Sequence, residues 1–95
     1  MKGVFILKIN HEKDSELLKA LGHPIRLKIV DGLMSGHECN VNKIVKELQI
    51  PQSTVSQHLK VLRSSAIIDY HKKGVITCYH VINERVKDII KVLKK

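Results

Sequence analysis

Residues 52–63 carry the side chains of this 95-residue chain that are best suited to chemistry with a polar partner. In a helix with about 100° per residue, Ser53, Gln57 and Lys60 share one face, and Val55 and Leu59 lie opposite. No carboxylate occurs from residue 49 to residue 68. Hydroxyl, amide and ammonium groups suit base edges in the major groove, whereas acids would repel phosphates. We interpret this helix as a reader of double-stranded DNA; the alternative is an ordinary solvated face.

The elements around this helix have the order of a winged helix-turn-helix. A short helix is expected from residue 41 to 48, followed by a turn at 49–51 and the polar helix, so residues 41–64 form the helix-turn-helix. The β-rich segments 67–70 and 75–81 flank a tip at 71–74 and predict a hairpin wing over 67–81. We expect Lys72 and Lys73 to contact the DNA backbone or the minor groove; the alternative is a solubilising turn.

The candidate DNA contacts combine the polar helix, its flanks and the wing. They are Asn42, Gln52, Ser53, Thr54, Ser56, Gln57, His58, Lys60, Arg63, Lys72 and Lys73. For His58, base contact and packing at the edge of the apolar face are equally open. Arg26 falls on the buried stripe of a helix that begins at Pro24, so we expect a half-buried anchor whose charge is paired or bonded to carbonyls.

The two ends of the chain predict a dimer. Residues 1–10 are expected to form a strand-like or loosely docked arm. We expect a first helix that is capped by Asp14 or Ser15 and ends before Gly22, and a last helix that is capped by Asn83. The spacing of apolar residues on the last helix gives it a strongly apolar face, which a single small domain cannot cover completely. We therefore expect residues 1–22 and 83–95 to hold the dimerisation helices. The candidate dimer residues are Leu17, Leu18, Val86, Ile89, Ile90 and Leu93.

Composition narrows the class of protein. Lys and Arg number 17 against 9 Asp and Glu, a net charge of +8 that favours an anionic partner. Three aromatic residues are too few for stacking on single-stranded nucleic acid. We find no targeting segment, membrane span or catalytic constellation, and two cysteines are too few for a secreted scaffold. We expect one cytoplasmic domain over residues 1–95 that is not an enzyme.

Segments 18–30 (LKALGHPIRLKIV) and 51–59 (PQSTVSQHL) resemble the ArsR/SmtB family of winged-helix repressors, most of all PagR-type members without metal ligands. Tyr79 before Val81 fits the wing of that family, and the resemblance spans residues 12–94. It implies a mainly α fold with a small β-hairpin wing, in the order α-α-β-α-α-β-β-α. It also implies a homodimer, reading of a palindromic operator by the fourth helix, and repression. A winged helix turned into a protein-interaction module is the runner-up function.

The metal-sensing members of the family differ from this chain at their ligand positions. A Cys-x-Cys pair at the start of their third helix corresponds to Asn40 and Asn42 here, and the last helix has no histidine. Hard oxygen ligands such as Glu84 and Asp88 are a poor start for a transition-metal site. We therefore expect no metal site and no cofactor.

Cys39 and Cys78 are the remaining candidates for a signal. The expected strand before the third helix pairs with the second wing strand, so Cys39 and Cys78 lie on two paired strands. A disulfide, which needs Cα atoms under about 7 Å apart, is therefore one open outcome. Alternation along the strands predicts opposite facing, with Cys39 buried and Cys78 partly exposed. Dithiol members of the family place their cysteines on the second and last helices. Inert packing is the first interpretation, and a thiol- or redox-responsive repressor is the alternative.

Overall fold

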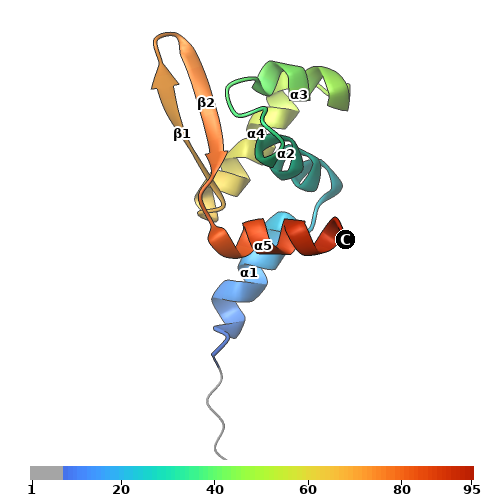
Figure 1. Ribbon diagram of the computed structural model, residues 1–95, viewed down its shortest axis with the longest axis vertical. Helices are drawn as coiled ribbons and strands as arrows, with labels where there is room; N and C mark the ends of the chain where they lie inside the picture. The colour runs from blue at the N-terminus through green and yellow to red at the C-terminus, as the bar shows by residue number, and fades with distance from the viewer. Residues whose placement is uncertain (1–7) are drawn as a thin grey trace, which may run out of the picture.

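A computed structural model describes residues 8–95 of the chain, so the arm expected at residues 1–10 lies mostly outside the described residues. The elements are α1 (His11–Leu21), α2 (Pro24–Met34), α3 (Val41–Leu48), α4 (Gln52–Ser64), β1 (Ile68–Lys73), β2 (Ile76–Val81) and α5 (Glu84–Leu93). The predicted class, mainly α with a hairpin wing, is confirmed. The wing rises at one end of the molecule, and α1 and α5 cross at the other end (Figure 1).

The strand expected before α3 is not formed, which corrects the predicted element order. The described sheet has two antiparallel strands, β1 and β2. Glu38 and Cys39 form a turn instead. Its one backbone bond to the wing runs from the Tyr79 N–H to the Glu38 carbonyl at 2.7 Å, and a single bond does not make a ladder.

Polar side chains fix the helix ends. Asn10 caps α1 by accepting the Lys13 N–H at 3.1 Å, so this helix begins earlier than Asp14 or Ser15 predicted. Asn83 caps α5 through the Val86 N–H at 3.1 Å, as predicted. Pro24 opens α2, where its missing N–H costs no hydrogen bond.

The core lies between the helices and the base of the hairpin. Its fully buried side chains come from α2, α4, the start of the wing, β2 and α5: Ile29, Val30, Leu33, Val55, Leu62, Ile67, Ile68, Cys78 and Val86. These aliphatic groups hold α4 against the molecule by its apolar face and leave its polar face outside. None of the described helices is long and apolar enough to cross a membrane.

The wing turns more tightly than expected. Gly74, with φ of 61°, and Val75 form the turn between the paired strands. Lys72 pairs with Thr77 and Lys73 with Ile76 in the strand register. The two lysines thus lie at the end of β1 rather than in the loop.

Candidate nucleic-acid interface

Helix α4 presents the polar face that the sequence predicted. Val55, Leu59 and Leu62 are buried, which turns the opposite side outward. The exposed side chains on α4 include Gln52, Ser53, Ser56, Gln57, Lys60 and Arg63, and Thr54 is half-buried. This is a convex, acid-free helix face of the kind that fits a major groove.

His58 belongs to the packing behind this face. It is half-buried, its ring centre lies 4.5 Å from that of His23, and its Nδ1 lies 3.3 Å from Nη1 of Arg26. Burial lowers the pKa of His58, and electrostatic interactions with the neighbouring His23 and Arg26 lower it further. These contacts favour the packing alternative for His58 over base contact.

Arg26 is the half-buried anchor that its position on α2 predicted. Its Nε donates to the Ala20 carbonyl, and its Nη2 donates to the Lys19 carbonyl at 3.4 Å. These carbonyls belong to the last turn of α1, where a cation also complements the helix dipole. Through His58, the same guanidinium connects the end of α1 with α4.

A groove of about 470 Å³ separates the helix-turn-helix from the wing. Asn42 on α3 and Gln52 and Ser56 on α4 line one side, and Val75 and Ile76 line the other. The structure therefore brings together predicted contacts from α3 and α4. It also adds Val75, which is 99% exposed and which the sequence interpretation missed. The sequence did contain a signal for Val75, because an apolar residue directly after the turn glycine of a hairpin is expected to be exposed.

Arg63, one of the predicted DNA contacts, is already engaged within the chain. Its Nε lies 3.5 Å from the Asp69 carboxylate, and its guanidinium stacks on Tyr70. Lys72 and Lys73 are exposed on the wing and have no salt bridge among the described residues. Lys60 and the two wing lysines thus supply positive charge on this surface that no salt bridge among the described residues offsets.

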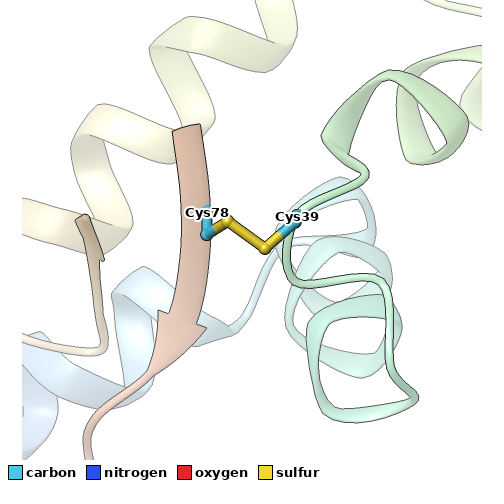
Figure 2. The surroundings of a disulfide bond; sticks show 2 residues. All are labelled: Cys39 and Cys78. Carbon is cyan, nitrogen blue, oxygen red and sulfur yellow. A yellow bond between two sulfur atoms is a disulfide. The ribbon is translucent and has the colours of Figure 1, made fainter. Parts of the chain in front are cut away.

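Cys39 and Cys78 form a disulfide, with Cα atoms 3.9 Å apart. Figure 2 shows the bond crossing from the turn before α3 to β2. The predicted facing was wrong, because Cys78 is 1% exposed and Cys39 lies on the surface. Strand alternation does not apply to Cys39, which is in a turn. The first interpretation of these two cysteines, as inert packing residues, is not consistent with a covalent bond between them.

The terminal helices divide the predicted dimer residues into two groups. Leu17, Val86 and Ile90 are buried within the protomer, and Ile89 is half-buried. The exposed group is Leu18 at 55%, Leu93 at 63% and, missed in the sequence, Val92 at 61%.

An ion pair joins these two helices within the protomer. Arg85 on α5 donates to the Asp14 carboxylate on α1 at 2.9 Å and holds the pKa of that carboxyl below its ordinary value.

Metal ligands do not gather anywhere in residues 8–95. No group of three or more His, Cys, Asp or Glu side chains lies close enough together to hold a metal ion there. Asn42 is exposed on the groove between the helix-turn-helix and the wing.

This architecture, with an exposed acid-free helix beside a basic hairpin, is that of a winged helix-turn-helix DNA-binding protein. The arsR family of bacterial regulatory proteins matches residues 23–70. The transcriptional repressor PagR of Bacillus anthracis is 44% identical over 82 residues, which cover 86% of this chain and 82% of PagR. An uncharacterized HTH-type transcriptional regulator of Methanocaldococcus jannaschii, MJ1325, is 40% identical over 83 residues, which cover 87% of this chain and 93% of that protein.

Solved structures agree with the sequence comparison. The crystal structure of PagR superposes with a TM-score of 0.77 at 43% identity, covering 87% of this chain and 94% of PagR. A homodimeric winged helix-turn-helix DNA-binding domain of Mycobacterium bovis has a TM-score of 0.78 at 25% identity, covering 99% of this chain and 87% of that domain. The chain belongs to the ArsR family, and it is a DNA-binding transcriptional regulator.

Proposed function

We propose that the protein is a homodimeric repressor that binds a palindromic operator through α4 and the wing. The observation that carries this proposal is the exposed face of α4, which has hydroxyl, amide and ammonium groups and no acid. PagR is named a transcriptional repressor and the Mycobacterium bovis domain is homodimeric, which supports the same arrangement here. Because operators are genomic DNA, we place the protein in the cytoplasm.

Base reading and phosphate binding fall to different residues in this proposal. Gln57, exposed at the centre of the α4 face, reads a base through its amide, and Ser53, Thr54 and Ser56 add short polar contacts. Lys60, Lys72 and Lys73 neutralise phosphates on either side. Asn42 and Gln52 line the groove between the helix-turn-helix and the wing. In this proposal, the sugar-phosphate backbone of the DNA lies along that protein groove.

Dimerisation rests on the exposed apolar side chains of α1 and α5. Leu18, Val92 and Leu93 leave apolar surface in water that a second copy of the chain would cover. Leu17, Val86 and Ile90 support these residues from inside the protomer rather than contacting the partner. Two α4 helices related by a two-fold axis would read half-sites about one helical turn apart.

The test begins with selection of bound duplexes from a random-sequence library, which identifies the operator sequence directly. The selected sequence is expected to be an inverted repeat. Gln57→Ala is then expected to weaken binding to it by about 1–3 kcal/mol while affinity for scrambled duplex stays the same. The proposal would be contradicted if the selected duplexes shared no common sequence. It would also be contradicted if the wild type bound selected and scrambled duplexes with equal affinity.

Salt titrations separate the lysines from Gln57. Lys60→Ala, Lys72→Ala and Lys73→Ala are each expected to weaken binding to every duplex. Each should also flatten the plot of log affinity against log salt by about 0.9, the value for one phosphate contact. Lys95→Ala, at the exposed C-terminal residue of the described chain, is the matched control and should leave the slope unchanged. If Lys72→Ala and Lys73→Ala both keep the wild-type salt slope, the wing lysines do not contact DNA phosphates.

A further inference from the structure

The two cysteines of the disulfide differ in their exposure to solvent. Cys39 lies exposed in the turn between α2 and α3. Cys78 is 1% exposed, on the inner side of β2. A small thiol or disulfide in solution therefore reaches the bond from the side of Cys39. The buried Cys78 is positioned as the partner that attacks from within.

The bond joins two parts of the DNA-binding surface. Helix α3 begins at Val41, two residues after Cys39, and β2 is the second strand of the wing. Cys39 itself lines the groove between the helix-turn-helix and the wing. Beside the disulfide, the hydrogen bond from the Tyr79 N–H to the Glu38 carbonyl joins the same two segments.

The cross-linked chain keeps the arrangement of solved DNA-binding relatives. It superposes on PagR with a TM-score of 0.77 while the disulfide is present. The bond is therefore compatible with the DNA-binding fold and holds the wing at a fixed distance from α3. After reduction, the Tyr79–Glu38 hydrogen bond and core packing remain to hold the two segments, and the wing gains freedom that DNA binding must then remove.

We propose that Cys39 and Cys78 are a reversible thiol–disulfide switch in which the bond holds the wing and α3 in their operator-binding arrangement and reduction weakens operator binding. This regulation rests on the proposed operator-binding function. The bonded form is the tighter binder because its groove is already ordered.

The chemistry is exchange with a low-molecular-weight disulfide. The Cys39 thiolate attacks one sulfur of the small disulfide, forms a mixed disulfide and releases one small thiolate. The Cys78 thiolate then attacks the sulfur of Cys39 and expels the second small thiolate. The two protons lost by the cysteines are taken up by the two small thiolates, so two cysteine thiols and one small disulfide become one protein disulfide and two small thiols. Reduction is the same sequence in reverse.

The experiment equilibrates the purified protein in glutathione buffers of varied ratio of oxidised to reduced form. Intact mass after acid quenching and alkylation gives the bonded fraction, and fluorescence anisotropy gives affinity for the selected duplex. We expect the bond to form and break reversibly, and the fully reduced protein to bind the duplex at least threefold more weakly than the bonded protein. Equal or tighter binding by the reduced protein would overturn the switch, as would a bond that does not form.

Cys39→Ser provides the control, because this exposed position tolerates a hydroxyl without disturbing the core. The variant is expected to bind like the reduced wild type at every glutathione ratio. Cys78→Ala removes the other sulfur without placing a hydroxyl in the core and should behave in the same way. A redox response that persists in either variant would overturn the assignment. Absence of binding in both redox states would overturn the operator-binding function and the switch with it, whereas equal binding in both states would overturn the switch alone.

Discussion

The guanidinium carbon of Arg63, at the end of α4, lies 4.4 Å from the centre of the Tyr70 ring on β1. The same guanidinium is 3.5 Å from the Asp69 carboxylate, and the Tyr70 ring lies 5.5 Å from that of Tyr79 on β2. This stack connects α4 with both strands of the wing. Arg63 is therefore placed to set the angle of the wing, in addition to or instead of the DNA contact that the sequence predicted.

Arg63→Lys tests this positioning role, because lysine keeps the charge and loses the planar group that stacks on Tyr70. An exposed cation–π contact is worth about 0.5–1 kcal/mol, so operator affinity is expected to fall about two- to fivefold with an unchanged salt slope. Tyr70→Leu should cause a similar loss, and the double variant should lose little more. Wild-type affinity in Arg63→Lys would mean that its charge alone matters.

The dimer is best tested on the side chains that the protomer leaves exposed. Leu18→Asp with Leu93→Asp is expected to give a folded monomer that no longer binds the operator, because each buried leucine contributes roughly 1.5–3 kcal/mol. Multi-angle light scattering gives the mass, and circular dichroism checks folding. Val75→Asp at the wing tip makes the same type of change at an exposed aliphatic residue and should leave the mass dimeric. A dimeric mass for the double variant would contradict the terminal interface.

Acid is expected to destabilise the protein through His58. Its pKa in the folded chain is lowered by burial and by His23 and Arg26, so between that pKa and about 6.5 the unfolded chain binds more protons. The stabilising contribution of neutral His58 is complete above about pH 6.5 and is lost as pH falls from that value to the lower pKa of the folded chain. Urea unfolding at pH 7.5 and 5.5 should show a larger loss for wild type than for His58→Gln. Equal losses, or an NMR titration midpoint at or above 6.5, would refute this.

Reduction of the disulfide is expected to lower global stability as well. Cys39 and Cys78 are 39 residues apart, and a cross-link closing such a loop typically contributes about 2–4 kcal/mol by restricting the unfolded chain. The urea midpoint should fall when wild type is reduced. Cys39→Ser should show that lower midpoint with or without reductant. Identical midpoints for the oxidised and reduced wild type would show that the bond adds no stability.

The helix-turn-helix and the wing could be predicted from the sequence because their signals are local. The spacing of Val55, Leu59 and Leu62 determines which side of α4 is buried, and Gly74 with its β-rich flanks specifies the hairpin. Pro24 and Asn83 mark helix starts by their own backbone chemistry. Each of these features depends on neighbours within a few positions, so the pattern alone was sufficient.

Contacts between distant segments were decided by the tertiary structure. The sequence analysis assigned the whole apolar face of α5 to the dimer interface. In the structure, packing against the core buries Val86 and Ile90 and leaves Leu93 exposed. Arg63 was predicted from the sequence as a DNA contact, and folding brings its guanidinium onto the Tyr70 ring. Periodicity gives the side of a helix that is apolar; it does not say how much of that side the rest of the protomer covers.

The cysteine pair shows the same limit most clearly. The sequence alone placed Cys39 and Cys78 near each other through the expected fold, but assigned Cys39 to a strand and predicted opposite facing. In the folded chain Cys39 lies in a turn, free of strand alternation, and its sulfur meets that of the buried Cys78. The sequence by itself determined the polar helix α4 and the wing, because short-range periodicity encodes them. Only the tertiary structure decided the cross-link between them, because it depends on the relative position of two segments that are 39 residues apart.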